Sequence, residues 1–254
     1  MLFIYLYVFF LGGAIASFLG VYVNRMLRNE GFILSRSYCE SCNRQLKWYE
    51  LIPIVSYILQ KGKCRTCKNN IGLDSFIYEL LLGTLFCICF FVYGFSYETL
   101  IGFVLSAFFI SVCMSDFKSL IILDSSIIAT IIFLIILILL SSGIAGIYKS
   151  FLYGVFAFVL MFLVKIIGDF AFKRESLGGG DIKLSFITGM VLPYNLFLTS
   201  LIISCCLAMP YALILTHKKK KVEIPFGPFL SFGLLITFLL ASYIEMMLKL
   251  FIIE

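Results

Sequence analysis

The stretch DSSIIATIIFLIILILLSS, residues 124–142, contains one charged residue and is an unbroken apolar run through its centre. A helix needs about 20 predominantly apolar residues to cross the hydrocarbon core of a bilayer, so this stretch predicts a transmembrane helix. The whole chain has the same character, since 62% of its 254 residues are hydrophobic and 13% are charged. The mean hydropathy is +1.08. This composition lies outside the range of water-soluble domains and predicts an all-α polytopic membrane protein.

Eight transmembrane helices are expected along the chain. The sixth is short, and Pro193 with Asn195 provides the turn that separates it from the seventh. The first is expected to stay in the bilayer, because no basic residue precedes it and no cleavage site is evident. We place the eight near residues 2–23, 75–94, 97–115, 124–142, 146–167, 182–193, 195–216 and 226–251.

The basic residues predict the orientation. Nine of the twenty Lys and Arg residues lie between Arg25 and Lys68, and short loops on the cytoplasmic side retain such residues. With this loop inside and both termini outside, eight spans leave Lys149 and Lys249 toward the outside. The net charge of +6 then reflects topology and contact with anionic lipids of the inner leaflet, and not nucleic-acid binding. The same arrangement places inside Lys118, Lys173, Arg174, Lys183 and the run from Lys218 to Lys221.

The loop between the first two spans contains two CxxC pairs, Cys39 with Cys42 and Cys64 with Cys67. Four thiolates suit the tetrahedral preference of Zn²⁺, and the cytosol keeps thiols reduced. The alternatives are redox dithiols or free cysteines. A loop this short has little core of its own, so we favour a structural zinc site. We divide the chain into a first transmembrane helix (1–24), a cytoplasmic zinc loop (25–73) and a seven-helix membrane domain (74–254).

The remaining cysteines and the single histidine offer little chemistry. His217 is the single histidine and adjoins a lysine run at the end of a span, so the sequence offers almost no residues for a mechanism based on histidine. The other five cysteines lie in apolar spans without the spacing of metal ligands, and we interpret them as small hydrophobic residues. They are Cys87, Cys89, Cys113, Cys205 and Cys206.

Two acidic residues are expected at the cytoplasmic ends of spans. Asp116 closes the third span, and Asp181 opens the sixth after three glycines, Gly178 to Gly180. A carboxylate at membrane depth usually marks function, although Asp181 as a simple helix N-cap is the structural alternative. The glycines favour function, because they remove side chains where a substrate backbone could approach.

An ordered set of motifs resembles the type IV prepilin peptidases, which are GxGD membrane aspartyl proteases. The motifs are ASFLGVYVNR (16–25), SYCESCNRQLKWYELIPIVSY (37–57), GKCRTCKNNIGLDSFIYELLLG (62–83), SDFKSLIILD (115–124), GGGDIKL (178–184) and PFGPFLSFG (225–233). The resemblance implies eight transmembrane helices, a cytoplasmic loop with paired CxxC, and catalysis by Asp116 and Asp181.

The matched motifs carry a few further expectations. The family usually has Pro before the second Asp of its first motif, where this chain has Leu123 before Asp124. Asp124 is the alternative partner for Asp181, but it lies about 12 Å along a continuous helix from Asp116 and could not share a proton with it. Two carboxylates in contact are expected to hold one proton between them, which suits acid and base catalysis of amide hydrolysis. Lys183 either biases the local field or snorkels to lipid headgroups.

By resemblance, the substrate is a pilin-like precursor whose short basic leader precedes an apolar helix, cut at the cytoplasmic face after a glycine. Many members of the family also methylate the new N-terminus with S-adenosylmethionine. The loop has no glycine-rich nucleotide motif, and its acidic candidates are Glu50, Asp74 and Glu79.

Two other classes of protein are considered. A zinc-stabilised transporter or assembly scaffold could use the aspartates to bind a cation or a partner. Transport predicts polar residues deep within several spans, whereas the middle of each span here is nearly free of charge. An intramembrane protease of the presenilin type shares GxGD but usually has Tyr where this chain has Ser115, and the cysteine loop favours the prepilin branch.

Overall fold

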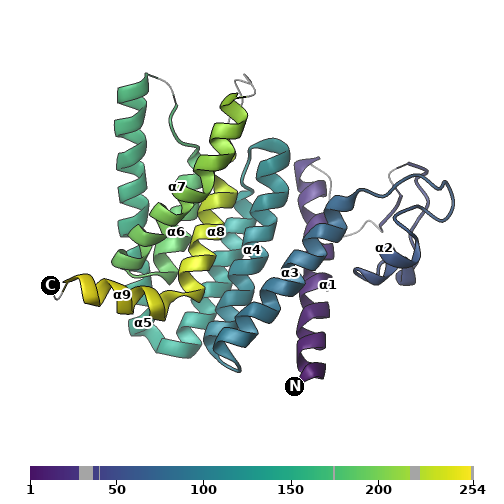
Figure 1. Cartoon of the computed structure of the whole chain (residues 1–254), viewed down its shortest axis with the longest axis horizontal. Coiled ribbons are helices and arrows are strands. Elements are labelled where there is room, and N and C mark those ends of the chain that lie inside the picture. The colour runs from purple at the N-terminus through teal and green to yellow at the C-terminus, as the bar shows by residue number, and fades with distance from the viewer. Residues whose placement is uncertain (29–36, 40, 174, 218–223, 253–254) are drawn as a thin grey trace. The chain divides into compact units, whose positions relative to one another are not determined.

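The computed structural model describes residues 1–28, 37–39, 41–173, 175–217 and 224–252, and these are mainly helical (Figure 1). Within these ranges there is no β-strand, and the two isolated β-bridges lie in the cysteine loop. The all-α prediction is therefore confirmed. Arg174 and the run from Lys218 to Lys221, which entered the orientation argument, lie outside the described residues.

The chain forms two compact units, residues 1–99 and 100–254. In the first unit, α1 (Leu2–Leu27) packs against α3 (Leu73–Tyr93). The helices touch at Gly12 and Gly83, where a Cβ added to Gly12 would lie 2.8 Å from the Gly83 Cα. The cysteine loop between them carries the 3₁₀ helix η1 (Trp48–Glu50) and the short helix α2 (Val55–Leu59).

The second unit is a bundle in which α5 packs on α6, α6 on α8, and α8 on α7. The α4 helix joins it through aromatic contacts, since Phe109 stacks on Phe232 of α8 and Phe117 meets Tyr211 of α7. The helices are α4 (Tyr97–Ser119), α5 (Asp124–Phe172), α6 (Gly179–Val191), α7 (Tyr194–His217), α8 (Gly227–Leu239) and α9 (Ala241–Ile252).

The 49 residues of α5 form two helical arms that meet at Gly143, whose φ of 67° and ψ of −164° are not helical. Side chains with a Cβ rarely adopt this φ, so glycine lets the chain change direction here. Ile131 and Val155, each twelve residues from Gly143, line one groove together. The two arms therefore lie side by side, in agreement with the expected boundary between spans 124–142 and 146–167.

Among the described residues, five helices are long and apolar enough to cross a membrane, or six when the bent pair α8 and α9 counts as one span. Eight spans remain a prediction, because this count takes α5 as one helix and α6 has 13 residues. At 1.5 Å per residue α6 is about 20 Å long, less than the hydrocarbon core.

The span expected over 226–251 is not one straight helix, because the chain bends by 77° between α8 and α9. In Figure 1 α9 runs across the direction of α8. Ser242, Glu245 and Lys249 follow each other at helical spacing and give α9 a polar stripe. An amphipathic helix of this kind is more stable at a membrane interface than in hydrocarbon, which gives a physical reason for the bend.

The contact between α5 and α6 fixes the helix that carries Asp181. A Cβ added to Gly189 of α6 would lie 2.9 Å from the Gly154 Cα, 2.6 Å from the Ala157 Cβ, and against the carbonyl oxygen of Tyr153. Small residues let helix backbones approach closely in membranes, where burial in lipid supplies no hydrophobic drive between helices. Gly189 therefore sets the distance between α6 and the second arm of α5.

We predict that Gly189→Leu destabilises the second unit by about 3 kcal/mol or more, because the new side chain must push backbone atoms apart. Gly72→Leu is the control, since the space around Gly72 is open and the loss of a glycine N-cap costs about 1 kcal/mol. Thermal unfolding in detergent measures both. Equal melting temperatures for the two variants would contradict the close-packing argument.

Candidate active site and candidate metal centre

Asp116 lies in the last turn of α4 and is 5% exposed. The helix ends just beyond it, where Leu120 has a φ of 55° and donates its N–H to the Asp116 carbonyl oxygen at 2.9 Å. The hydroxyl of Ser111 donates to that of Ser126 at 2.9 Å and ties α4 to the start of α5. The turn between the two helices thus holds Asp116 in a defined, buried position.

Asp181 lies in the first turn of α6 and is 8% exposed. Gly178 is the N-cap of the helix, and its backbone contacts the Asp181 carboxylate. The three glycines serve different purposes. A Cβ on Gly180 would lie 3.1 Å from Ile122, whereas the space around Gly179 is open. The glycine motif therefore accommodates a neighbouring side chain at Gly180 and leaves a free face at Gly179.

The structure brings Asp116 and Asp181 to the same place in the second unit. Their carboxylates are close enough to interact electrostatically. The Ile122 side chain contacts both Gly180 and Gly227, because a Cβ on Gly227 would meet it at 2.8 Å. The same Cβ would lie 2.9 Å from the Asp116 carboxylate oxygen, and the backbone of Gly227 donates to that carboxylate.

Sequence reasoning did not assign a role to Ile122 or Gly227. Gly227 lies between Phe226 and Pro228 at the start of α8, and a glycine among bulky residues at a helix start is the signal that could have indicated a close approach. Ile122 carried no such signal, because an isoleucine between two predicted spans looks like any other apolar residue. Its role depends on contacts with residues 58 and 105 positions further along the chain.

Asp124 faces a different partner. Lys183 donates to the Asp124 carboxylate at 2.6 Å, and this ion pair joins the starts of α5 and α6. The Asp124 side chain is 65% exposed, whereas Asp116 is buried. Asp124 is therefore already engaged by a cation and is a poorer partner for Asp181 than Asp116 is.

A largely apolar groove of about 330 Å³ lies beside this ion pair. Both arms of α5 contribute to it, and Lys183 of α6 lies two residues from Asp181. The groove therefore places an apolar surface next to the helix that carries one of the two buried carboxylates. It is lined by Ile127, Ile131, Val155, Phe158, Lys183 and Phe186.

The four loop cysteines come together in the first unit. Their sulfur atoms all lie within 4.8 Å of one another, and the sulfurs of Cys39 and Cys67 are 3.9 Å apart. A tetrahedral site with metal–sulfur bonds of about 2.3 Å requires sulfur separations of about 3.8 Å. The cluster can therefore hold a metal ion.

The two cysteine pairs have the same backbone geometry. In the first, Cys39 donates its N–H to the Arg44 carbonyl at 2.9 Å, and in the second, Cys64 donates to the Asn69 carbonyl at 2.9 Å. The residue after each second cysteine, Asn43 or Lys68, has a positive φ. Two equivalent turns thus present two sulfurs each, as a shared metal would require.

The electrostatics of the thiols also favour a cation. Hydrogen bonds from the backbone of Cys67 and Thr66 lower the pKa of the Cys64 thiol to about 6. The pKa of Cys67 is raised to about 11, since burial and the neighbouring thiol groups outweigh the hydrogen bond from the Asn69 backbone. One thiol ionises easily and its neighbour then resists, so four adjacent thiolates require a bound cation.

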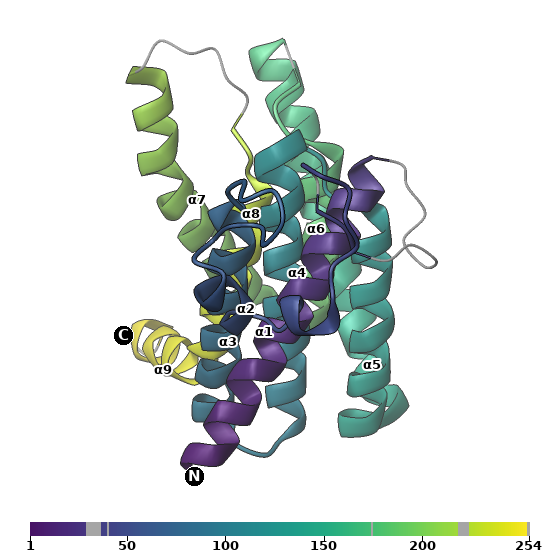
Figure 2. The same ribbon diagram turned by 90° about the vertical axis from the view of Figure 1, so that its right-hand side faces the viewer.

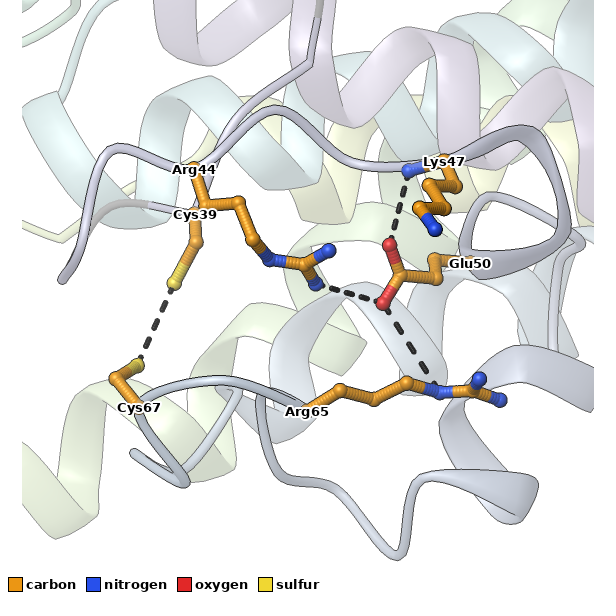
Figure 3. A network of polar contacts seen from close by, with 6 residues as sticks. All are labelled: Cys39, Arg44, Lys47, Glu50, Arg65 and Cys67. Carbon is orange, nitrogen blue, oxygen red and sulfur yellow. Dashed lines mark hydrogen bonds and ion pairs between the residues drawn. The ribbon is translucent and has the colours of Figure 1, made fainter.

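A buried glutamate connects the two cysteine turns (Figure 3). Glu50 is 6% exposed, and its carboxylate accepts from the Arg44 guanidinium at 2.7 Å and from the Lys47 N–H at 2.9 Å. Arg65, from the second turn, lies 4.0 Å from the same carboxylate. The hydrogen bond from Arg44 is the largest of the influences that keep the pKa of Glu50 below its usual value. Glu50 is therefore an ionised carboxylate that joins the two cysteine turns beside the cluster.

The structure also places the other two acidic candidates of the loop, Glu79 and Asp74. Glu79 of α3 is buried and accepts from the Ile54 N–H at 2.6 Å. Ile54 itself has a φ of 64° and a ψ of −55°, and the Val55 N–H donates to the Pro53 carbonyl at 2.5 Å. This is a γ-turn of the rare, strained kind, which Glu79 holds against α3. Asp74 is exposed in the first turn of α3.

The remaining cysteines lie in helices, away from ligand spacing, as the sequence indicated. Cys87, Cys89 and Cys113 are partly or fully buried, and the Cys87 thiol donates to the Tyr5 carbonyl at 3.5 Å. Cys205 and Cys206 are exposed on α7.

Comparisons with known proteins identify the family of the chain. Residues 10–93 match the family model of the bacterial peptidase A24 N-terminal domain, and residues 103–213 match that of the type IV leader peptidase family. No solved structure matches the chain.

Several bacterial proteins named as prepilin peptidases are similar to the chain over most of its length. A prepilin leader peptidase/N-methyltransferase of Vibrio cholerae is 34% identical over 66% of this chain and 68% of its own length. The enzyme with the same name from Bacillus subtilis is 31% identical over 85% of this chain and 88% of its own. One from Neisseria gonorrhoeae is 29% identical over 77% and 68%. The chain therefore belongs to the type IV prepilin peptidase family of membrane peptidases.

We predict that the purified, reduced protein contains about one equivalent of zinc, bound by Cys39, Cys42, Cys64 and Cys67. Cys39→Ser combined with Cys64→Ser should lose the metal and loosen the loop, because two thiolates cannot complete a tetrahedral site. Metal analysis and limited proteolysis measure the two effects.

The matched control replaces two cysteines of α7, Cys205→Ser with Cys206→Ser, and should keep the full metal content. Absence of zinc from freshly purified, reduced parent protein would favour a dithiol role for the cluster.

Proposed function

We propose that the protein cleaves the basic leader from type IV prepilin-like precursors at the cytoplasmic face of the membrane, with Asp116 and Asp181 as its catalytic dyad. The observation that carries this proposal is the meeting of two buried carboxylates from α4 and α6, next to a glycine with open space around it. The names of the related bacterial enzymes support the substrate class.

The chemistry follows from the pairing of the carboxylates. Hydrolysis of an amide by water needs a base that accepts a proton from the water and an acid that protonates the departing amine. Two adjacent carboxylates that share one proton supply both roles and exchange them after the bond breaks. Neither Asp116 nor Asp181 needs a metal or a histidine nearby for this sequence of proton transfers.

The surroundings of the dyad fit an extended substrate next to an apolar helix. The open face at Gly179 lets a substrate backbone approach Asp181 closely. The groove between α5 and α6 offers an apolar surface for the first residues of the mature chain. Lys183 and Asp124 form an exposed ion pair between the starts of these helices, outside the pair of buried carboxylates.

The proposed setting is a multi-pass protein of the bacterial cytoplasmic membrane, with the cysteine loop and both aspartates on the cytoplasmic side and both termini outside. The charge bias of the loop supports this orientation. The metal of the loop is Zn²⁺, which suits four thiolates in a reducing compartment. Inner-leaflet lipids surround the basic residues.

The protein is further proposed to methylate the new N-terminus with S-adenosylmethionine, as the names of the relatives suggest. In this reaction the cofactor supplies an electrophilic methyl group, and the protein must present the amine in its neutral form. Glu50 and Glu79 are both occupied by hydrogen bonds within the loop. They are therefore better described as supports of the loop than as groups free to accept that proton.

Substitution of the dyad tests the peptidase proposal. Asp116→Asn and Asp181→Asn should each abolish cleavage of a prepilin-like substrate, because asparagine keeps the shape but cannot exchange the proton. The double variant should be little worse than either single one, since residues that act as a unit are not additive. Cleavage is followed by gel shift in reconstituted membranes, and folding by thermal unfolding of each variant.

Asp124→Asn is the control and should keep most of the activity, because its carboxylate is exposed and paired with Lys183. Full activity of Asp116→Asn together with loss in Asp124→Asn would show that Asp124 is the true partner. Retained cleavage by Asp181→Asn would contradict the aspartyl-protease mechanism altogether.

The mass of the cleaved product tests the methylation proposal. With S-adenosylmethionine present, the new N-terminus should be heavier by one methyl group than the product formed without the cofactor. The Asp116→Asn protein, given a substrate from which the leader has already been removed, should still methylate it, because that reaction does not need the dyad. An unmodified product under all conditions would show that this chain is a peptidase alone.

A further inference from the structure

The middle of the cysteine loop exposes large apolar side chains. Trp48 is 77% exposed, Ile58 59% and Leu59 70%, and Leu51 and Ile52 are exposed as well. They belong to η1, to the turn that follows it, and to α2, which together form the segment 48–59. A loop in water rarely presents so many large apolar residues within twelve positions unless another surface covers them.

The turn of this segment lies beside the membrane helices and not beyond their ends. A Cβ on Gly13 of α1 would touch Pro53 at 3.4 Å and Ile54 at 3.5 Å, and Ile54 is hydrogen-bonded to Glu79 of α3. Figures 1 and 2 both place α2 at a level between the two ends of α1. The loop therefore folds back along its own helices.

The contacts give the depth of the turn. Gly13 lies ten residues, or about 15 Å, before residue 23, where the first span is expected to end, and Glu79 lies four residues, or about 6 Å, after residue 75, where the second is expected to begin. Ile54 contacts both positions and Pro53 contacts the first, so with the expected span ends both residues lie below the membrane surface. Their exposed neighbours Leu51 and Ile52 must then meet lipid.

Basic and aromatic side chains flank the apolar ones. The Lys47 ammonium lies 5.9 Å and the Arg65 guanidinium 5.0 Å from the centre of the Tyr49 ring, and the Trp48 ring meets that of Tyr49 edge-on at 5.7 Å. Lys47 and Arg65 are exposed. Trp and Tyr with Lys and Arg are the residues that gather where a bilayer meets water, and the cations complement anionic headgroups.

We infer that the segment 48–59 is a membrane anchor that inserts into the inner leaflet beside α1 and α3. Its apolar side chains contact acyl chains, Trp48 and Tyr49 lie at headgroup level, and Lys47 and Arg65 bind anionic phospholipid headgroups. The anchor holds the metal cluster against the bilayer, because Glu50 follows Tyr49 directly and ties both cysteine turns to this segment. The inference does not depend on the proposed peptidase function.

Trp48 is the single tryptophan of the chain, so its fluorescence reports on this segment alone. The full-length protein is reconstituted in vesicles of phosphatidylcholine and phosphatidylglycerol that contain lipids brominated near the headgroup or deep in the acyl chain. Lipid brominated near the headgroup should quench Trp48 most, and aqueous iodide should quench it several-fold less than free tryptophan. Trp48→Phe with Ile88→Trp is the depth reference, because Ile88 is exposed in the second half of α3, about 5 Å from the centre of the expected span 75–94.

A second pair of variants tests the charge. Lys47→Gln with Arg65→Gln should weaken the dependence of Trp48 emission on phosphatidylglycerol, whereas Lys149→Gln, outside this segment, should leave it unchanged. Quenching of Trp48 by iodide as strong as that of free tryptophan, with no effect of brominated lipid, would overturn the inference. Protection from iodide that requires an added prepilin-like peptide would assign the surface to the substrate and equally overturn it.

Discussion

The cost of burying a carboxylate in an apolar chain governs much of this structure. An unpaired buried charge is so unfavourable that each one needs a hydrogen-bond donor or a partner charge. Among the described residues, four acidic side chains are buried: Glu50, Glu79, Asp116 and Asp181. Each meets a backbone donor at a turn or helix start, from Lys47, Ile54, Gly227 and Gly178 respectively.

The charged neighbours of these four carboxylates separate their roles. Glu50 joins two turns and lies between two guanidinium groups, which lower its pKa and favour its ionised form. Asp116 and Asp181 have each other as a neighbour, an arrangement that raises the energy of the doubly ionised state and suits proton exchange. The same need for hydrogen-bond partners thus produces a structural contact between two turns in one unit and the pair of carboxylates that we propose as catalytic in the other.

Glycines decide where helices meet in both units. Gly12 and Gly83 bring α1 to α3, and Gly189 brings α6 to α5. In the second unit, Gly180 and Gly227 both accommodate the Ile122 side chain, which holds the ends of α4, α6 and α8 around Asp116 and Asp181. A glycine that could be interpreted from the sequence as a flexible position is therefore a point of close contact in the fold.

The sequence by itself determined the membrane class and the two cysteine pairs, and it predicted the boundary between spans 124–142 and 146–167 and the candidate residues Asp116 and Asp181, because hydropathy and motif spacing are local properties of the chain. It did not determine the bend between α8 and α9, the contacts of Ile122, Gly227 and Glu50, or the folding of the segment 48–59 along α1 and α3. These features join residues distant in the chain, and their energies depend on which surfaces lie together after folding. The local periodicity of the sequence does not indicate which surfaces pack together, so the tertiary structure alone decided these features.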